Sequence, residues 1–368
     1  MLLVKGNRDT LLPPLQVVSG IVERRQTLPI LSNVLLERKG GTLSFLATDL
    51  EIQISTQEQC DSEGADASFT VAARKLLDIL RTLPEAAPIE LALNEGKLRI
   101  TAGNSRFMLH TLPPEDLPRL PDGDSASAEV RVPESALKQL FALVQYAMAQ
   151  QDVRYYLNGL LLVAEASRLT AVATDGHRLA LSSVGCDGPQ NRSEVILPRK
   201  AVLELSKLLG DTSSEVLMNF GQAQVSVILG QTRMVSKLID GKFPDYARVI
   251  PSDQQTHFVL PRALLQQALQ RVAILASEKF RGVRWLLTDN SLRIICTNTD
   301  QEEAQEEIAT DYKGEALDIG FNVGYLLDVL NSVRSEDINC RVGNASSSAL
   351  FTVPDNEDFK YVVMPMRI

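Results

Sequence analysis

The chain has 368 residues, 45% of them hydrophobic and 23% charged, and a formal net charge of −9. This length predicts two or three domains, each able to bury its own core. We expect no secretory signal, because the N-terminal residues contain no apolar run long enough for a signal h-region. We expect no membrane segment, because no uncharged apolar stretch approaches the roughly 18 residues that span a bilayer. The four cysteines stand singly without CxxC spacing, which argues against a disulfide framework or a zinc site and favours a cytoplasmic location.

An apolar-Thr-Asp segment recurs three times at a nearly constant spacing. The copies end at Asp49, Asp175 and Asp300, which lie 126 and 125 positions apart. Each copy follows a polar turn and a predicted strand that contains leucine. Because recurrence at a fixed period is the signature of repeated structural units, we expect three copies of one unit.

Two amphipathic helices are predicted in each unit from apolar residues at helical spacing. The first helices are expected at residues 10–18, 133–148 and 261–275. The last two should begin with proline, whose missing N–H costs nothing at a helix start, whereas Pro13 and Pro14 leave the start of the first undefined. The second helices are expected at residues 73–80, 198–205 and 322–330, with the acidic residues Asp78, Glu204 and Asp328 in phase.

Alternating strands separated by hairpin turns follow each second helix. They are expected at residues 89–93, 97–102, 106–111, 215–220, 224–229, 234–239, 337–342, 349–353 and 361–366. Proline- and acid-rich stretches at 112–128 and 243–255 are predicted as linkers. The sequence therefore predicts an α+β fold of three repeats, each a mostly antiparallel sheet with two helices, in domains at 1–127, 128–253 and 254–368.

The charge is predicted to be unevenly distributed. The segments taken as helices, residues 9–25, 73–83, 133–151, 198–209, 261–273 and 322–334, hold 12 Lys and Arg against 6 Asp and Glu. They carry +6, so the rest of the chain carries −15. Basic helices in an acidic protein offer phosphates one attractive face, although for any single helix an ordinary solvated surface is the preferred interpretation.

The segment from Thr174 to Leu179 taken alone allows a catalytic interpretation, with His177 as acid–base group, Asp175 orienting it and Arg178 holding an anion. Against an enzyme, the other two histidines lie in no comparable motif, and no Gly-x-Ser-x-Gly, P-loop or metal-spaced cluster occurs. The matched positions of the other repeats carry Leu50-Glu51-Ile52 and Gln301-Glu302-Glu303, without histidine. We therefore expect no catalytic residue, metal or cofactor. A static DNA-binding module is the remaining alternative, distinguished by lasting affinity for linear DNA.

Longer motifs across the chain resemble the bacterial sliding clamps, the β subunits of DNA polymerase III holoenzyme. They lie at residues 27–31, 151–159, 173–180, 240–246, 278–284 and 361–367. The resemblance implies a DNA clamp fold that closes as a ring-shaped homodimer, encircles double-stranded DNA without sequence preference and slides freely. Such a protein is a non-catalytic processivity factor in DNA replication. Its implied partners are the DNA polymerase III catalytic subunit, the clamp loader complex, and other polymerases and repair proteins that bind through short hydrophobic peptides.

The resemblance also implies three sets of site residues. DNA contacts correspond to Arg25, Arg74, Gln151, Tyr155 and Tyr156. The partner-peptide groove corresponds to Leu157, Thr174, Gly176, His177, Arg178, Leu179, Pro244, Arg248, Val249, Asn322, Tyr325, Val362, Met364, Pro365, Met366 and Arg367. The dimer interface corresponds to Lys75, Arg99, Arg106, Phe107, Leu109, Ile274, Leu275, Asp300, Glu302, Glu303 and Glu306.

The residue types suit these roles, but each has an ordinary structural alternative. Arginines neutralise phosphates and tyrosines stack on unpaired bases, yet the same residues occur on solvated faces and in strand cores. Methionines and a proline make an adaptable apolar surface, or an edge strand at 362–366. The acidic run 300–307 contains no basic residue, so we expect its partners on another chain or in solvent. Helix charge alone adds Arg199, Lys200, Arg262 and Arg271 as DNA-contact candidates.

Overall fold

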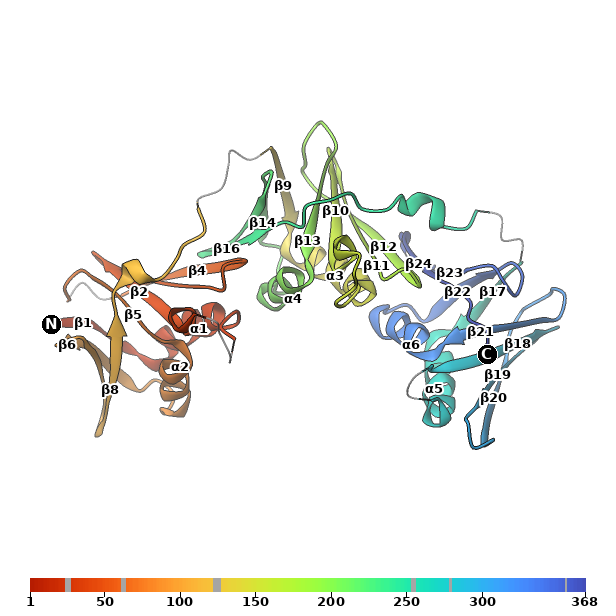
Figure 1. The fold of residues 1–368 in the computed structure, drawn as a ribbon, viewed down its shortest axis with the longest axis horizontal. Helices are drawn as coiled ribbons and strands as arrows, with labels where there is room; N and C mark the ends of the chain where they lie inside the picture. Colours follow the sequence, from red (N-terminus) through yellow and green to blue (C-terminus); the bar gives the residue numbers. More distant parts are fainter. Residues whose placement is uncertain (24–27, 61–63, 122–126, 253–255, 278–279, 355) are drawn as a thin grey trace. The chain divides into compact units, whose positions relative to one another are not determined.

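The structure is a computed structural model that describes residues 1–23, 28–60, 64–121, 127–252, 256–277, 280–354 and 356–368 (Figure 1). Contacts divide the chain into two compact units. Unit 1 comprises Met1–Ser135 and Leu203–Leu238, and unit 2 comprises Ala136–Val202 and Ile239–Ile368. Among the described residues, no helix combines the length and apolar character needed to cross a membrane.

The predicted threefold repeat is confirmed by the order of the elements. The same series occurs three times: one strand, a helix, four strands, a second helix and three strands. Every strand pair that the structure describes is antiparallel. The prediction of three α+β repeats dominated by antiparallel sheet is therefore correct.

The six α-helices lie close to their predicted positions. They are α1 Arg8–Ser19, α2 Ala73–Thr82, α3 Glu134–Val144, α4 Arg199–Leu208, α5 Arg262–Val272 and α6 Val323–Ser332. Helix α1 begins after Asn7, whose side-chain oxygen accepts a hydrogen bond from the Thr10 amide at 2.9 Å. The prolines expected to open α3 and α5 instead end the preceding strands. Those are edge strands, where a missing N–H is also tolerated.

Unit 1 contains one twelve-stranded sheet. Its order is β1-β6-β7-β8-β5-β2-β3-β4-β16-β15-β14-β9. The strands are β1 Leu2–Asn7, β2 Asn33–Lys39, β3 Thr42–Thr48, β4 Ile52–Gln59, β5 Ala67–Ala72, β6 Pro88–Asn94, β7 Lys97–Ala102, β8 Ser105–Leu112, β9 Ala128–Pro133, β14 Glu215–Phe220, β15 Gln224–Leu229 and β16 Thr232–Lys237. Helix α1 packs against α2 and against strands β3 and β4.

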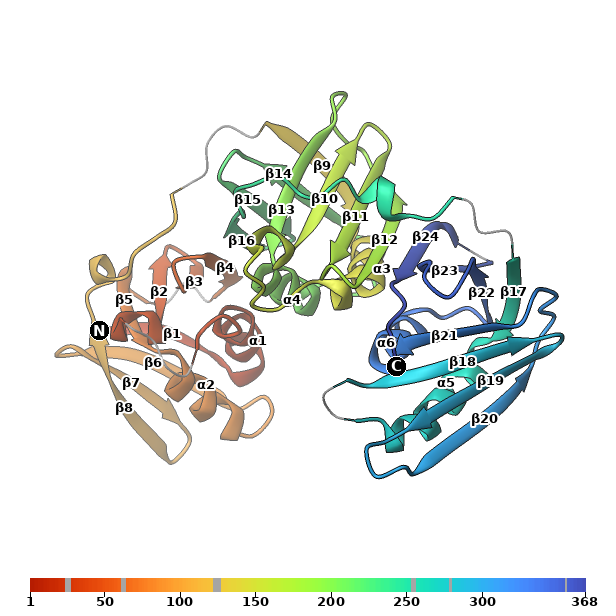
Figure 2. The same ribbon diagram turned by 45° about the vertical axis from the view of Figure 1, so that its right-hand side comes forward.

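Unit 2 contains an eight-stranded and a four-stranded sheet, in the orders β13-β10-β11-β12-β24-β23-β22-β17 and β20-β19-β18-β21. The strands are β10 Gly159–Glu165, β11 Arg168–Thr174, β12 Arg178–Gly185, β13 Ser193–Pro198, β17 Thr256–Pro261, β18 Gly282–Thr288, β19 Ser291–Thr297, β20 Glu303–Ala309, β21 Leu317–Asn322, β22 Asp337–Val342, β23 Ala349–Val353 and β24 Asn356–Val363. Helix α5 packs on β19, β20 and α6 (Figure 2). Buried Trp285 meets Phe321 and Phe351 edge-on in the core of the third repeat.

Consecutive repeats are joined by strand pairing. We call the pair β4–β16 the first junction and the pair β12–β24 the second junction (Figure 1). In each, the third strand of one repeat's four-stranded group pairs with the last strand of the following repeat. The first junction lies wholly in unit 1 and the second in unit 2, so the units divide the middle repeat between them.

The recurring Thr-Asp element is a turn capped by its own side chains. In the second repeat, the Thr174 hydroxyl donates to the Arg178 carbonyl and Asp175 accepts from the backbone amides of His177 and Arg178. Thr48 and Asp49 make the same bonds in the first repeat. These shared bonds fix the backbone from which β4 and β12 start.

The third copy of the turn corrects the sequence alignment. Asn298, not Asp300, holds the capping position, since its side-chain oxygen accepts from the backbone amides of Asp300 and Glu302 at 3.0 and 2.9 Å. An amide oxygen accepts these bonds as a carboxylate does, which hid the equivalence from a search for aspartate. Matching by hydrogen bonds therefore moves the third copy two residues earlier.

We predict that Asn298→Ala destabilises the β19–β20 hairpin by about 1 kcal/mol, because the substitution leaves two turn amides without their acceptor. Hydrogen exchange of the β19 and β20 amides measures the change. Asp300→Ala is the matched control and should shift exchange by less than about 0.5 kcal/mol, as surface substitutions do. A larger effect at Asp300 than at Asn298 would restore the original alignment.

Candidate functional site

The hydrogen bonds of Asp175 give this carboxylate a structural role in the turn at the second junction and not a role in acid–base chemistry. One Asp175 oxygen accepts from the two backbone amides of the turn, and the other accepts from Arg178 Nε at 3.0 Å. The carboxylate is thus committed to the turn and to the arginine. His177 is exposed, and its carbonyl accepts a hydrogen bond from the Met364 amide at 2.9 Å. The catalytic interpretation therefore lacks its orienting carboxylate.

Arg178 ties the second repeat to the third. Its side chain is 9% exposed and donates to Asp328 at 2.6 Å and to the Tyr146 carbonyl at 2.6 Å. The guanidinium carbon lies 4.3 Å from the centre of the Tyr325 ring, a cation–π contact. These contacts use the planar donor fork that lysine lacks. Arg178 therefore lies below the surface and holds the second and third repeats together at the second junction.

An apolar cluster lies beside this turn in unit 2. Its buried members are Ala149, Leu157, Leu161, Val163, Val172, Leu179, Leu181, Ile196, Phe243, Leu350 and Val362. Three of them, Leu157, Leu179 and Val362, are predicted groove residues, each 1% exposed. Leu179 and Val362 face each other across the junction as register partners on β12 and β24. The structure thus brings residues from three distant chain segments into one apolar cluster.

Exposed predicted residues follow the same junction. Val249 is 44% and Met364 48% exposed, while Gly176, Pro244, Arg248 and Arg367 are also exposed. The chain beyond β24 is held by its backbone, since the Met366 amide donates to the Gly320 carbonyl at 2.9 Å. Pro365 and Met366 are half-buried.

Three other predicted groove residues have structural contacts. Thr174 supplies the turn hydroxyl, and Asn322 caps α6 by accepting from the amides of Gly324 and Tyr325. Tyr325 is half-buried beneath Arg178. Together with Arg178, these three make four of the sixteen predicted groove residues that support the surface through hydrogen bonds and ring contacts.

The loop before β10 is attached to the turn by Arg154. Its guanidinium donates to Asp152, lowering the pKa of that carboxyl to about 2, and to the Asp175 carbonyl at 3.1 Å. The pair with Asp152 is therefore formed above pH 4 and lost only as the pH falls towards 2. A Cβ atom on Gly176, whose φ is +88°, would lie 2.7 Å from Arg154 Nη2. Gly176 thus admits the guanidinium as well as the backbone angle.

Three of the four predicted DNA-contact residues that the structure describes are exposed. Arg25 lies outside the described residues. Arg74 is exposed on α2 and donates to the Val22 carbonyl at 2.9 Å. Gln151 is exposed with a φ of +57°, and Tyr155 is 57% exposed against half-buried Tyr156. Tyr155 therefore presents the more available ring for stacking.

The six described α-helices retain the predicted excess of basic residues, with 10 Lys and Arg against 5 Asp and Glu. Several of these cations have partners within the chain. Arg262 donates to the Ser335 and Leu330 carbonyls, and Arg199 donates to the Met148 carbonyl. Arg271 pairs with Glu306 at 2.6 Å. Arg74, Lys75 and Arg81 on α2 give the clearest exposed basic face.

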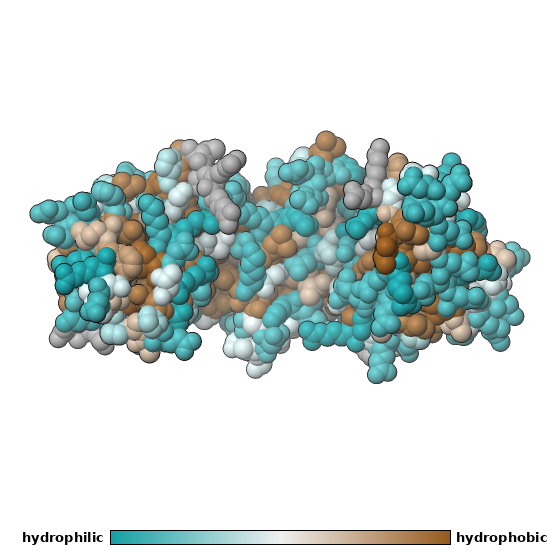
Figure 3. All heavy atoms as spheres, turned by 90° about the horizontal axis from the view of Figure 1, so that it is seen from below, coloured by the Kyte–Doolittle hydropathy of each residue, from teal (hydrophilic) through white to brown (hydrophobic). Residues whose placement is uncertain are grey.

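The predicted interface residues divide into exposed and paired groups. Ile274 is 79% exposed, Phe107, Leu109 and Leu275 are half-buried, and Lys75, Arg106, Asp300 and Glu303 are exposed. On the face shown in Figure 3, hydrophobic side chains gather in small patches on a mostly hydrophilic surface. Arg99 lies 3.7 Å from Glu90, and Glu302 accepts from Asn298 at 2.6 Å. Glu306 pairs with Arg271 of the same chain, and its place at the dimer interface stays a prediction.

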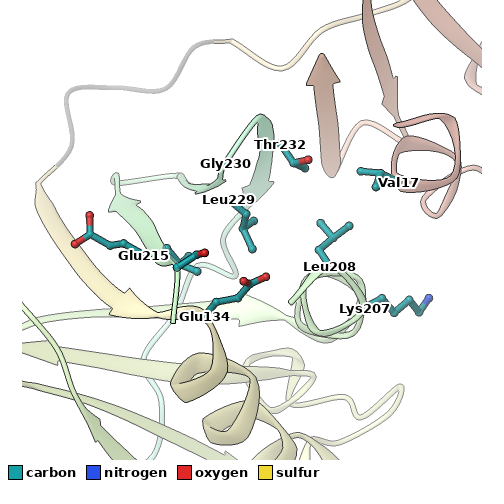
Figure 4. Close-up of a pocket in the computed structure, with 10 residues that line it drawn as sticks. Val17, Glu134, Lys207, Leu208, Glu215, Leu229, Gly230 and Thr232 are labelled. Atoms are coloured by element: carbon teal, nitrogen blue, oxygen red, sulfur yellow. The ribbon is translucent and has the colours of Figure 1, made fainter. Parts of the chain in front are cut away.

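A cavity that the sequence did not indicate lies in unit 1. Its volume is about 350 Å³, and Figure 4 shows it between α1, α4 and the β15–β16 hairpin. Val17, Leu208, Leu229 and Thr232 line it, together with the Glu134 carboxylate. Glu134 accepts from the Gly210 amide at 2.7 Å and from the Thr212 hydroxyl. Among the described residues, no group of three or more His, Cys, Asp and Glu side chains is arranged to hold a metal.

Comparison with known proteins accounts for the repeated fold and the junction. Three domain families of the DNA polymerase III beta subunit match in order: the N-terminal domain at 4–121, the central domain at 131–245 and the C-terminal domain at 247–367. The Beta sliding clamp of Pseudomonas putida is 47% identical over 362 residues, and that of Escherichia coli K12 is 42% identical over 361. Each alignment covers 98% of both chains. The chain belongs to the family of DNA polymerase III beta subunits.

Solved structures of family members share the whole fold. A DNA polymerase sliding clamp from Pseudomonas aeruginosa, crystallised with a ligand, superposes with a TM-score of 0.96 at 45% identity over 100% of both chains. A second structure of that organism's clamp, bound to griselimycin, gives a TM-score of 0.96 at 46% identity over 100% of both chains. The clamp from Caulobacter crescentus gives 0.93 at 36% identity, covering 100% of this chain and 99% of its own. The three-domain clamp fold is therefore confirmed.

Sequence reasoning missed several residues that shape the second junction. Asp328 was noted only as an acidic residue in helical phase, and Tyr146 and Arg154 were not singled out. Each acts through a partner distant in sequence, such as Arg178, 150 positions from Asp328. The sequence did contain one signal for Asp328, because Asp78, Glu204 and Asp328 occupy equivalent positions in the three repeats. An acidic residue that recurs on an amphipathic helix suggests a cationic partner elsewhere in the fold.

We predict that Asp328→Asn loosens the second junction, because Arg178 loses one of its two carboxylate partners. The Asp328 side chain is 42% exposed, so we expect about 1 kcal/mol and not the larger cost of a fully buried pair. Hydrogen exchange of the β12 and β24 amides reports the opening. Asp78→Asn, on the exposed face of α2, is the matched control. Unchanged exchange in Asp328→Asn would contradict the role assigned to Arg178.

Proposed function

We propose that the chain is a DNA sliding clamp: two copies close head-to-tail into a ring that encircles double-stranded DNA and tethers polymerases to it. The observation that carries this proposal is the pair of strand edges left open by the repeat. Strands β4 and β12 pair with β16 and β24, whereas the equivalent strands β20 and β8 have no corresponding partner among the described residues. A second copy supplies it.

The geometry of these two strands supports the dimer. Strand β20 is the edge of the four-stranded sheet, and β8 pairs with β5 only at Thr111 and Leu112. Unprotected edges are templates for pairing with another chain. Arg106 lies on β8 and Glu303 on β20, with exposed Ile274 in the same unit as β20. A contact between unlike edges that closes after one rotation gives a ring.

DNA would be held loosely inside this ring. Arg25 and Arg74 would neutralise phosphates, Gln151 would hydrogen-bond the backbone, and Tyr155 and Tyr156 would stack on unpaired bases. Phosphate contacts carry no sequence information, which suits sliding. The net charge of −9 with an excess of basic residues on the helices favours DNA inside the ring over adsorption on its outside.

Partners would dock at the second junction. We propose that a short hydrophobic peptide lies over Leu157, Leu179 and Val362, between Met364 and Val249, and that griselimycin binds this chain there as well. The DNA polymerase III catalytic subunit, the clamp loader complex, other polymerases and repair proteins would compete for the site. Flexible Met364 and Met366 adapt to different ligands. The protein would act in the cytoplasm as a non-catalytic subunit.

Topological linkage gives the first test. After loading by a clamp loader and ATP, the protein should stay on nicked circular DNA and leave within seconds to minutes once that DNA is linearised. Gel filtration of the loaded DNA measures the fraction retained. Equal retention on circular and linear DNA would indicate static binding and contradict the sliding mechanism.

A monomeric variant is the control for this experiment. Wild type should have a native mass of about 81 kDa, twice the chain mass of 40.4 kDa. Ile274→Asp places a charge in the proposed apolar interface and should give a folded monomer that is not retained on either DNA. A wild-type monomer at micromolar concentration would count against the ring.

Removal of Met364–Ile368 tests the docking site. We predict that the truncated chain remains a dimer but binds polymerase at least about tenfold more weakly, a loss of ~1.4 kcal/mol, so that stimulation falls by about 90% at sub-saturating clamp concentrations. Met364→Ala should reproduce part of the loss without disturbing the hydrogen bond of its backbone amide. Arg341→Ala, an exposed substitution on β22, is the control. A fully active truncation would overturn the assignment.

A further inference from the structure

The two junctions share one backbone arrangement. In the first junction the Lys237 amide donates to the Glu51 carbonyl at 2.9 Å, and in the second the Met364 amide donates to the His177 carbonyl at 2.9 Å. The strand registers agree as well, since Gln53 pairs with Val235 where Leu179 pairs with Val362. With the shared Thr-Asp turn, this equivalence relates the two junctions residue by residue. The first junction therefore has the same backbone as the proposed docking site.

The side chains at the equivalent positions differ in a consistent direction. Leu50 replaces Gly176 and adopts a φ of +78°, which a leucine rarely does. Its side chain packs against a small apolar cluster formed by Leu31, Leu35 and Leu117, with Ile30 and Leu46. Gln53 replaces Leu179, and Lys237 replaces Met364. The first junction thus carries a leucine and two polar side chains where the second carries an exposed glycine, a buried leucine and an exposed methionine.

A segment of the chain itself covers the first junction. We call residues Leu117–Pro121 the strap. Leu117 is 3% exposed in the apolar cluster, and the Leu120 amide donates to the Gln53 side chain at 2.9 Å. Arg119 pairs with Glu37 at 3.0 Å, and the Pro121 carbonyl accepts from Gln224. The strap was predicted only as part of a linker, but four contacts hold it to the junction.

The corresponding segment at the second junction is held differently, since Phe243 is buried in the apolar cluster and Tyr246 and Ile250 pack against it. Arg248 and Val249 follow strand β16 as Arg119 and Leu120 follow strand β8. The Arg248 side chain is 86% exposed and pairs with exposed Asp245, while Val249 is 44% exposed. Leu179, equivalent to Gln53, has no polar atom with which to fasten a strap. The segment after β16 therefore packs on the apolar cluster and leaves Arg248 and Val249 exposed, like Met364, where an outside peptide could bind.

We propose that the first junction is a second copy of the partner-binding architecture, closed by the chain's own strap, so that each chain offers one peptide site instead of two. The inference rests on the proposed docking function of the second junction. Three differences distinguish the junctions. Leu50 stands where the second junction has Gly176, and Gln53 stands where it has Leu179. The segment that follows is hydrogen-bonded to Gln53 at the first junction, whereas at the second it leaves Arg248 and Val249 exposed. The strap therefore acts as a permanent internal ligand that determines partner stoichiometry.

Exchanging these residues tests the inference, with griselimycin as the probe in calorimetric titrations. Wild type should bind one molecule per chain. Gly176→Leu with Leu179→Gln closes the second junction and should weaken binding at least about tenfold. Leu50 already adopts the positive φ that this turn requires, and the flexible Arg154 side chain must move aside for the new Cβ. In that closed background, four substitutions open the first junction: Leu50→Gly, Gln53→Leu, Leu117→Ala and Lys237→Met. They should restore one griselimycin site per chain, now at the first junction. Glu115→Gln, exposed beside the strap, is the control.

Hydrogen exchange separates this inference from the docking proposal. The Leu120 amide should exchange at least about tenfold more slowly than in an unstructured peptide, and Gln53→Leu should remove that protection. Rapid exchange of Leu120 in wild type would overturn the strap even if griselimycin binds. Protected Leu120 without griselimycin binding to wild type would contradict the docking proposal while supporting the strap. A folded, opened variant whose strap exchanges freely but binds no griselimycin would also overturn the inference.

Discussion

The antiparallel pairing between consecutive repeats is the constraint on which the rest of the structure depends. At the second junction it sets Leu179 opposite Val362 and brings the end of the chain beside a turn almost two hundred residues earlier. Side chains alternate between the faces of a strand, so a slip of one residue would turn both groups away from the apolar cluster. The capped Thr-Asp turn fixes where β12 begins and so protects this register. The candidate site is therefore a consequence of backbone pairing.

A buried charge stabilises the second junction, where Arg178 stands at the position that Ile52 occupies in the first. The Arg178 side chain is almost fully removed from water. Desolvating a cation is costly unless it is fully paired. Two carboxylates, the Tyr146 carbonyl and the face of Tyr325 meet this requirement at the second junction. An apolar side chain suffices at the first, which carries no exposed docking surface to orient.

The sequence predicted the elements well because helices, alternating strands and hairpin turns are local patterns. Strands β14, β15, β22 and β23 have the predicted bounds. It failed where a role depends on a distant partner or on chemistry shared by different residues. Asn298 replaces an aspartate as the turn cap, and Arg271 from α5 pairs with Glu306 on β20. Neither pairing has a sequence period, so only the fold reveals it.

Divergence of side chains on a common backbone explains how one repeated unit serves several purposes. Gly176 and Leu50 hold the same turn with a positive φ, yet one leaves the surface open and the other covers it. A repeat that kept a glycine at both turns would expose apolar surface at both junctions, a liability in an acidic protein that must stay soluble. Closing the first junction with the strap removes that surface at the cost of a strained leucine. The strand edges at the three equivalent positions also serve different purposes. Pairing satisfies two of the three equivalent positions within the chain, and the third, between β8 and β20, is the natural place for another copy.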